Sequence, residues 1–422
     1  MNKAVVIVLV IAGIGAAIGL FAIIRRQRYV SSLRDRGWTF EGSPTWDAVA
    51  RLANPPFGLG FVRKPDDQIT GSTSTGRPFQ VIEYGAEHWK GWVGMVTLSR
   101  RLPELWIIGG QTQLRYGVTA TSVPAPPQLG PGWKVGALDS AYGAEVLTPQ
   151  LCERLTVMAA TQPGLNLSID GDQLVVLDPP RKDPAVLAEW LEQLASIAAV
   201  IDATPLDRWI QPERPQRLTF YQHPEWYWVG VDDSLLQTTR VTRSGHSHST
   251  SDVIRGRDGN GPPFVAFTHE WKTTRTESYT DSEGRSQTRQ VTENHSEAVL
   301  GFQLPVPMPA LSVGRRGGFG RGISFESGAF NEQFKVKADD TKFAYDVIHP
   351  RQMEYLMASP PAPFEFAGDW VWFSPGQHSH ELIEHSSVFL NGFLTRIPRF
   401  VWRNLGLPDT PYPDLLSGVS QT

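Results

Sequence analysis

Cysteine is nearly absent from this sequence, and its absence excludes several kinds of site. The only cysteine, Cys152, allows no internal disulfide, no zinc site built on cysteines and no iron–sulfur cluster. It lies in the stretch Pro149–Leu155, whose pattern predicts an amphipathic helix. In that setting the expected role is a small core residue and not a catalytic thiol.

An excess of positive charge is also missing. The net charge of −4 gives no electrostatic basis for binding nucleic acid, which requires a basic face. Hydrophobic residues make up 41% of the 422 residues and charged residues 19%, which is typical of a folded globular protein. A chain of this length has room for two domains, each with its own core.

Motifs for catalysis or metal binding are missing as well. There is no Gly-x-Ser-x-Gly nucleophile elbow, and no acidic pair is marked as a general acid and base. The cluster from His378 to His385 has the composition of a zinc-protease helix. However, His380 and His385 would lie roughly 140° apart around a helix, whereas zinc needs positions i and i+4 on one face. His246 and His248 lie in a polar loop, where imidazoles often bind nothing. We therefore assign no catalytic, cofactor-binding or metal-binding residue and expect no cofactor.

A long uncharged run opens the chain. Ala4 to Ile24 carries no charged residue, and at about 1.5 Å per residue its length matches a hydrocarbon core of about 30 Å. The alternative is a signal peptide, but its apolar part is shorter and a cleavage site follows it. Here Arg25 and Arg26 follow directly. We predict a transmembrane anchor over residues 1–28, in contact with the lipid bilayer.

The flanking charges predict the orientation of this anchor. Lys3 alone precedes the run, and several arginines follow it between Arg25 and Arg36. Because basic flanks stay in the cytoplasm, we predict a single-pass protein of the cell membrane with a cytoplasmic soluble part. Gly15 and Gly19 form a small-xxx-small pattern that suits a homodimer of anchors, although glycine is frequent in membrane helices without that role.

The soluble part contains an internal repeat. Residues 132–155 align without a gap with residues 333–356, which pairs Asp139 with Asp340. Three more blocks keep the same order: 69–79 with 254–264, 102–105 with 308–311, and 169–172 with 366–369. Collinear blocks of this kind indicate a duplicated unit.

Both halves of the repeat predict the same elements. Two strands come first, and a third strand then leads through Asp139 or Asp340 into a short helical turn. A helix opened by Pro149 or Pro350, two strands around a Gly-Asp turn and a last helix complete the unit. Strands grouped with packed helices, without regular alternation, indicate two tandem diverged copies of one α+β domain. The predicted order is an anchor at 1–28, copy one at 29–201, a linker at 202–215, copy two at 216–406 and a flexible tail at 407–422.

The copies differ most between their first two strands. In copy two this connection runs from Lys272 to Glu297 and is long and polar, which suits either a solvated hairpin or a disordered loop. In copy one it is short and contains Trp89 and Trp92. Because the short connection is polar, we expect both tryptophans at the surface as candidates for partner contact.

A glycine- and arginine-rich stretch over residues 314–322 provides further candidates for partner contact. Arg315, Arg316 and Arg321 lie in it and are suited to holding a phosphate or an acidic surface. No Gly-Lys-Ser or Gly-Lys-Thr follows, so the stretch is not a P-loop. A solvated linker is the alternative interpretation.

The second copy resembles a known group of proteins. The residues that carry the resemblance are Phe330, Asn331, Phe334, Val336, Asp339, Asp340, Ala344, Pro350, Glu354 and Leu356. They form the pattern Phe-Asn-x-x-Phe-x-Val, an acidic pair and Pro-x-x-x-Glu-x-Leu. This pattern is similar to that of uncharacterised single-anchor bacterial membrane proteins classed as a family of unknown function. The resemblance implies membrane association and fold, and it carries over no catalytic residue.

Three functions follow as hypotheses. Because no catalytic spacing is present, we favour a non-enzymatic interaction module tethered at the plasma membrane, with a protein partner. The second is a membrane-associated hydrolase with a site between the two copies, which a cleft of histidines and carboxylates from both copies would support. The third is an envelope- or sugar-binding protein facing outward, which requires the opposite orientation of the anchor.

Overall fold

The computed structural model describes residues 20–21, 23–61, 63–86, 89–109, 121–239, 243–259, 261–280, 285–317 and 322–407. Over these residues the chain combines helices with two antiparallel sheets, which confirms the predicted α+β class. It divides into two compact units, Met1–Tyr221 (unit 1) and Gln222–Thr422 (unit 2). The sequence prediction placed the connection between its two domains earlier, at residues 202–215.

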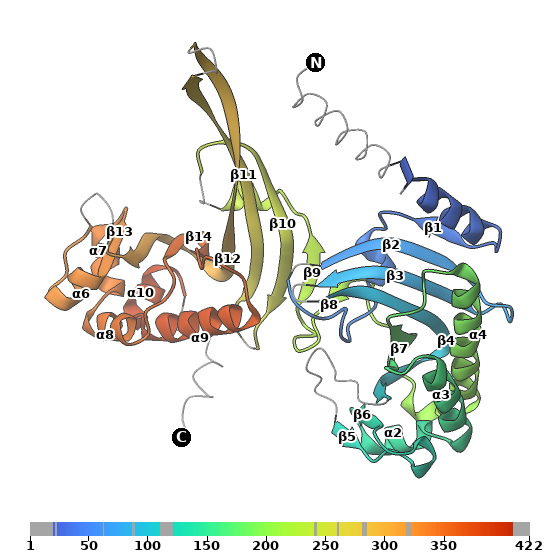
Figure 1. Cartoon of the computed structure of the whole chain (residues 1–422). Helices are drawn as coiled ribbons and strands as arrows, with labels where there is room; N and C mark the ends of the chain where they lie inside the picture. Colours follow the sequence, from blue (N-terminus) through green and yellow to red (C-terminus); the bar gives the residue numbers. More distant parts are fainter. Residues whose placement is uncertain are drawn as a thin grey trace. The chain divides into compact units, whose positions relative to one another are not determined.

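Unit 1 begins with a helix over residues 23–34, followed by a series of strands and helices (Figure 1). In chain order these are β1 (Thr39–Glu41), η1 (Trp46–Val49), β2 (Arg63–Ser72), β3 (Pro78–Ala86), β4 (Trp89–Ile108), β5 (Thr121–Val123), η2 (Pro127–Leu129), β6 (Lys134–Ala137), α2 (Ser140–Val146), α3 (Pro149–Thr161), β7 (Asn166–Leu177), α4 (Pro184–Ala203), η3 (Asp207–Trp209) and β8 (Leu218–Thr219).

The sheet of unit 1 is built around the long strand β4. The strand order is β1-β2-β3-β4-β6-β5, and β7 pairs with β4. Helices α3 and α4 pack on each other, and α4 packs on β4. Leu151, Cys152 and Leu155 of α3 are fully buried, as is Leu194 of α4. The predicted core role of Cys152 is therefore confirmed.

Local sequence signals set the helix ends of unit 1. Asp139 caps α2 by accepting hydrogen bonds from the backbone N–H groups of Ala141 and Tyr142. Asp183 caps α4, as its position before a proline predicts. The predicted pair of strands around the Gly-Asp turn at Gly171 is wrong, because β7 is one strand that follows β4 past a bulge opposite Leu102.

Unit 2 has its own series of elements. In chain order these are β9 (Tyr227–Gly230), α5 (Leu235–Thr238), β10 (His246–Arg257), β11 (Pro263–Thr280), β12 (Ser286–Arg315), α6 (Gly328–Gln333), β13 (Phe334–Ala338), α7 (Thr341–Val347), α8 (Pro350–Ala358), β14 (Phe364–Phe373), α9 (His380–Arg396) and α10 (Arg399–Asn404).

The sheet of unit 2 has apolar groups on both faces. Its strand order is β13-β12-β11-β10-β9, and β14 pairs with β12. On one face Phe364 packs against Phe389 and Phe393 of α9. On the other face Phe267 and Trp372 belong to a separate buried cluster.

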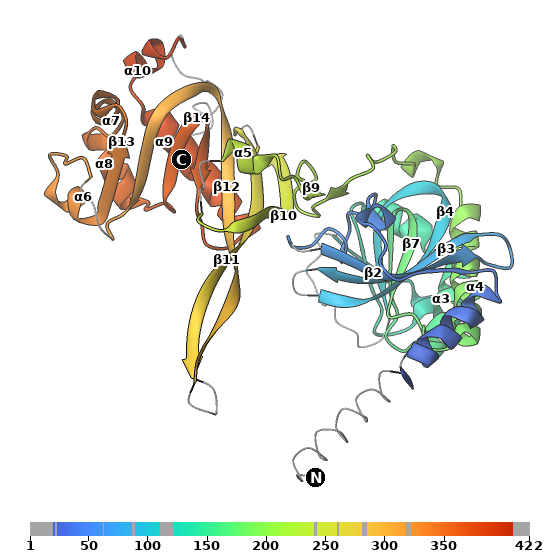
Figure 2. The same cartoon turned by 90° about the horizontal axis from the view of Figure 1, so that it is seen from above.

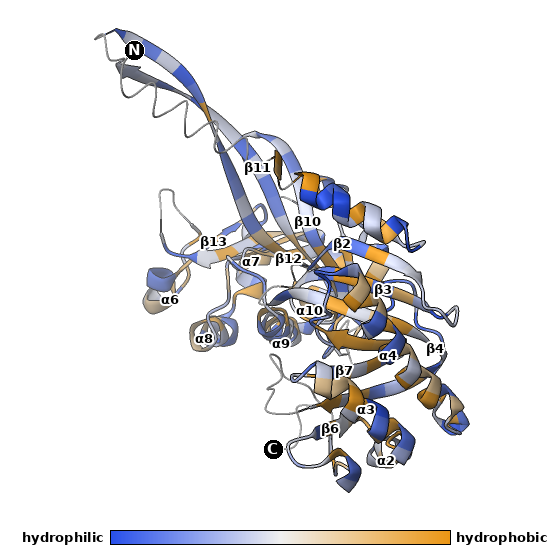
Figure 3. Ribbon diagram, turned by 45° about the vertical axis from the view of Figure 1, so that its right-hand side comes forward, coloured by the Kyte–Doolittle hydropathy of each residue, from blue (hydrophilic) through white to orange (hydrophobic). Residues whose placement is uncertain are grey.

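Strands β11 and β12 continue as a hairpin beyond the rest of the sheet (Figures 1 and 2). Their ladder runs from Phe264↔Phe302 to Thr280↔Ser286. Strand β10 accompanies β11 only as far as Lys272, and β14 meets β12 only from Leu300 onward. Of the two alternatives for this connection, the structure has the hairpin. Its far part is polar (Figure 3).

The predicted anchor lies mostly outside the described residues. Ala4, Gly15 and Gly19 are not described, and Ile24 lies in the helix over residues 23–34. Among the described helices, α4 is long and apolar enough to cross a membrane. Its apolar stripe belongs to the core cluster of unit 1, which accounts for its hydropathy.

Candidate functional site

A chain of polar side chains crosses three strands of unit 2 near the base of the hairpin. His269 of β11 is 1% exposed. Its Nε2 atom lies 3.0 Å from Nδ1 of His248 on β10, and its Nδ1 atom lies 3.1 Å from Oε1 of Glu297 on β12. Glu297 in turn accepts hydrogen bonds from the guanidinium of Arg243. We call this arrangement the Arg243–Glu297–His269–His248 chain.

The strand register produces this chain. His269 lies directly opposite Glu297 in the β11–β12 ladder and opposite Thr250 of β10. Because side chains alternate between the faces of a strand, the next residue on the same face of β11 is Trp271. Its indole contacts His269 in a tilted arrangement, with 5.0 Å between ring centroids, and stacks on His295 at 5.2 Å.

Electrostatics keep Glu297 ionised. Burial raises the pKa of Glu297, but the hydrogen bonds and positive charges of Arg243 and His269 outweigh that effect and lower it. The hydrogen bonds that Arg243 donates to Glu297 in turn raise the pKa of Arg243. The pair is therefore a charged, bidentate contact at neutral pH.

The Arg243–Glu297–His269–His248 chain has the carboxylate and the imidazole of a catalytic triad but lacks the nucleophile. A carboxylate orients a buried imidazole, as in an acid–base–nucleophile triad. At the position where a hydroxyl or thiol nucleophile would accept or donate the proton, the structure places the imidazole of His248. Over the described ranges, no group of three or more His, Cys, Asp or Glu side chains is arranged to hold a metal ion. The arrangement fixes strands and orients Arg243.

Arg243 also lines a pocket on the same unit. The pocket has a volume of about 420 Å³ and is bounded by the ends of β12, β13 and β14. Lys335 and Lys337 of β13 and Arg315 of β12 contribute cations, and Glu365 contributes the carboxylate. We call this the basic pocket.

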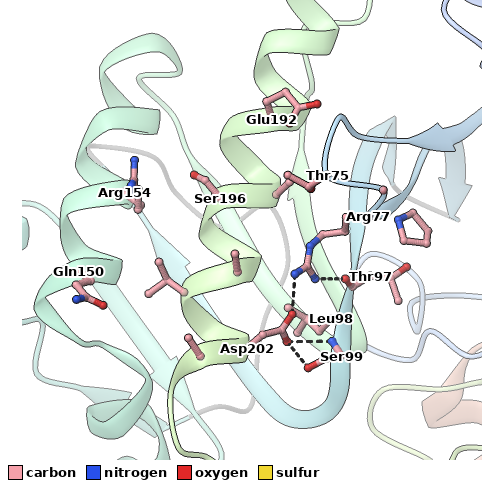
Figure 4. A pocket seen from close by; sticks show the side chains of 16 residues that line it. Thr75, Arg77, Thr97, Leu98, Ser99, Gln150, Arg154, Glu192, Ser196 and Asp202 are labelled. Atoms are coloured by element: carbon pink, nitrogen blue, oxygen red, sulfur yellow. Dashed lines mark hydrogen bonds and ion pairs between the residues drawn. The ribbon is translucent and has the colours of Figure 1, made fainter.

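Unit 1 carries a different groove, between α3, α4, the connection from β2 to β3 and the middle of β4 (Figure 4). It has a volume of about 780 Å³. At one end Asp202 accepts hydrogen bonds from Arg77 at 2.8 Å and from the hydroxyl and backbone N–H of Ser99. These charged groups satisfy one another, so they indicate no bound ligand.

The comparisons with known proteins establish no family. No family model matches the chain, and no curated protein matches it. One solved structure is similar, the crystal structure of the mycobacterial trehalose monomycolate transport factor A, TtfA. The identity is 13% and the TM-score 0.33, over 44% of this chain and 97% of that one. So slight a likeness carries no argument, and the resemblance seen in residues 330–356 stays a prediction.

The predicted exposure of Trp89 and Trp92 is wrong. Both are 8% exposed and lie in β4. Trp89 folds back over Gly91, whose missing side chain leaves room for the indole ring. The guanidinium of Arg181 lies 4.2 Å from the ring of Trp92 and covers it. Strand pairing between β3 and β4 reaches into the segment that we took for a loop.

The predicted arginine candidates have different positions. Arg315 ends β12, is exposed and lines the basic pocket. Arg316 donates to the carbonyl oxygen of Asn331 at 2.7 Å, which ties it to α6. Arg321 lies outside the described residues. Whether these arginines contact a partner stays a prediction.

Sequence reasoning did not identify His269, Glu297 or Arg243 as a site. They are separated along the chain, and only the register of β10, β11 and β12 brings them together. A signal was present in the alternation of His269 and Trp271 with more polar neighbours. It indicates a half-buried strand and not the partner of each side chain.

Proposed function

We propose that the protein is a membrane-tethered, non-enzymatic interaction module that holds a partner through the far part of the β11–β12 hairpin. One observation carries this proposal. Beyond Lys272 the two strands pair with each other and, among the described strands, with no other. A two-stranded ribbon of this kind contributes little to a core, and its open edges suit pairing with another chain.

Cross-strand contacts keep the hairpin extended without help from unit 2. Arg275 lies 3.0 Å from Glu293, and Arg289 lies 3.0 Å from Glu277. Opposite charges across a strand pair add stability and also discourage indiscriminate pairing of the edges. A rigid, charged ribbon is therefore suited to one complementary partner.

We further propose that the two units are diverged copies of one domain. The support is that β6, α2 and α3 recur as β13, α7 and α8 in the same order. In both units the cap aspartate, Asp139 or Asp340, accepts from the second and third N–H groups that follow it. The turn glycines Gly171 and Gly368 share a positive φ of 64° and 62°. In unit 1 only two residues of the sequence separate β3 from β4, so the domain does not need a long hairpin in order to fold.

The anchor over residues 4–24 is part of the proposal. Its apolar length supports it, and so does the way the next helix joins unit 1. Leu33 is fully buried in the core of unit 1, Tyr29 donates to the carbonyl oxygen of Arg181 at 2.6 Å, and Arg26 pairs with Asp67. A helix fixed in this way would hold unit 1 close to the bilayer, on the cytoplasmic side by its basic flank.

Crosslinking in the native membrane tests the hairpin proposal. The test compares the full chain with a variant in which an Asn-Gly turn joins Thr273 directly to Glu293, which face each other in the ladder. We expect a specific crosslinked partner with the full chain and its loss in the shortened variant, with unchanged circular dichroism. A chain that ends at Leu407 is the matched control. Equal recovery of the partner with the full chain and with the shortened hairpin variant would overturn the role of the hairpin.

Two treatments test the anchor. We expect alkaline extraction to leave the full chain in the membrane and to release a chain that starts at Arg25. We also expect protease added to intact cells to leave the soluble part uncut. Digestion from outside would contradict the cytoplasmic orientation and favour an outward-facing, envelope-binding protein.

A further inference from the structure

We propose that the basic pocket of unit 2 binds a phosphate group. The pocket lies at the ends of β12, β13 and β14 and is independent of the far part of the hairpin. Its volume of about 420 Å³ is at the lower end of the range for small-molecule sites. The argument rests on its cations, on one buried donor and on the room left by a glycine.

Two of the cations lie on β13, opposite uncharged residues of β12. Lys335 lies opposite Gly314, and Lys337 lies opposite Ser312. Residues two apart on a strand point to the same side, so both lysines share one face of β13. Arg315 follows at the end of β12. Within the described part of the chain, Lys337 and Arg315 form no ion pair, which leaves their charge available to a ligand.

The buried donor is the indole N–H of Trp372. The side chain lines the pocket and is 4% exposed, and among the described residues its Nε1 atom has no hydrogen-bond acceptor. A buried donor without an acceptor is costly. The six-membered ring covers Gly301, so the N–H lies on the opposite edge of the indole. An anion in the pocket would supply the missing acceptor.

Space and donor number favour phosphate over a carboxylate. A side chain at position 314 would approach only Pro363, at 3.8 Å, so glycine leaves the strand surface beside Lys335 open. Lysine ammonium groups, the indole N–H and the hydroxyl groups of Ser312 and Ser374 provide more donors than two carboxylate oxygens use. A tetrahedral dianion has enough acceptor oxygens for all of them.

Titration of the full chain in detergent tests the proposal. The probes are inorganic phosphate, glycerol 3-phosphate and short-chain phosphatidic acid, with chloride at matched ionic strength to remove simple screening. We expect saturable binding of phosphate-bearing probes and none of chloride. Equal affinity for all three probes would indicate a free phosphate group as ligand, and a preference for phosphatidic acid a lipid headgroup.

Three variants make the test specific. We expect Lys337→Glu to weaken binding about tenfold or more, because it replaces an unpaired cation with a carboxylate that repels the phosphate. We expect Trp372→Phe, which keeps an aromatic ring and removes the N–H, to weaken binding several-fold in a chain that circular dichroism shows to be folded. Lys342→Gln on α7, which pairs with Asp346 outside the pocket, is the control and should bind normally.

Two results would overturn the proposal. One is the absence of saturable binding by a folded full chain. The other is binding that Lys337→Glu and Trp372→Phe leave unchanged. The hairpin variant separates this proposal from the proposed function, because joining Thr273 to Glu293 leaves every pocket residue in place and should leave phosphate affinity unchanged.

Discussion

At the scale of single residues, the pKa of Glu297 determines how the Arg243–Glu297–His269–His248 chain responds to acid. Burial acts to raise this pKa, and Arg243 and His269 together lower it below the usual 4.5. A carboxyl group whose pKa is lower in the folded state stabilises the fold above its unfolded pKa. That contribution is lost as the pH falls through the folded pKa. Unit 2 should therefore lose stability as the pH drops below about 4.5.

The substitution Glu297→Gln tests this response. It removes the charge and leaves Arg243 without its carboxylate, so we expect the free energy of unfolding near pH 7 to fall by about 1–2 kcal/mol. We also expect a shallower loss of stability between pH 5 and the acid limit, measured by denaturant unfolding followed by circular dichroism. The control Glu293→Gln removes an exposed partner of Arg275 and should have almost no effect. Parallel pH profiles for wild type and Glu297→Gln would contradict the assignment.

Residue-scale predictions from sequence succeeded where the cause is local. The short helical turns after Asp139 and Asp340 were predicted, and they form because a cap needs only its own side chain and the next few N–H groups. The burial of Trp89 was missed because it depends on Gly91, two positions along the strand, and on pairing with β3. Trp228 and Gly230 have the same relation, whereas Gly94, two positions after Trp92, is covered by Trp190 instead, so the spacing alone does not predict a folded-back indole.

At the scale of elements, the β11–β12 hairpin should be least stable at its far end. Near its base Phe267 is fully buried and β12 has β14 as a further neighbour. Beyond Lys272 each strand has only the other. Local opening costs less where fewer contacts must break.

Amide hydrogen exchange measures this difference. We expect slow exchange at Phe264–Phe267 and exchange at least about a hundredfold faster at Thr276–Tyr279, because a difference of a few kcal/mol in local opening corresponds to that factor. The residues of β12 that pair with each of these two regions should exchange at the same rate as their partners. If the whole hairpin were equally protected from exchange in the isolated chain, another surface would already cover the far part of the hairpin.

The sequence left this element open between a hairpin and a loop for a physical reason. Residues 272–297 have no apolar face, so periodicity cannot report a strand there. What holds the ribbon together is cross-strand pairing such as that of Thr274 with Thr292. Such pairing depends on a register that the sequence alone does not state. The shared order β6–α2–α3 and β13–α7–α8 was predictable, because each of those elements has its own apolar stripe or cap.

At the scale of the whole molecule, the boundary between the units differs from the predicted one. The stretch 202–215 is rich in proline and charge, which is typical of a linker. In the structure Leu206 belongs to the core cluster of unit 1, and Trp209 donates to Glu145 at 2.8 Å. Farther on, Arg214 pairs with the buried carboxylate of Asp170. Its apolar and paired residues attach this stretch to unit 1.

This attachment predicts different stabilities for two fragments of unit 1. One begins at Arg25 and ends at Tyr221, and the other ends at Ile201. The shorter fragment loses the buried side chains of Leu206 and Phe220, each worth about 1.5–3 kcal/mol, and leaves the carboxylate of Asp170 without Arg214. We expect its Tm to be lower by roughly 6–24 °C, since the two side chains together amount to about 3–6 kcal/mol and 1 kcal/mol shifts Tm by about 2–4 °C at this size.

Point variants of the longer fragment separate packing from chain length. Leu206→Ala should reproduce part of the loss, about 2–4 kcal/mol, because it leaves a cavity in the core. Ile210→Ala in the same stretch should cost little, because Ile210 is 52% exposed. Equal Tm values for the two fragments would mean that residues 202–215 are a linker after all, as their composition suggests. A Tm that falls with Leu206→Ala but not with Ile210→Ala would mean that this stretch is held to unit 1 by the packing of Leu206.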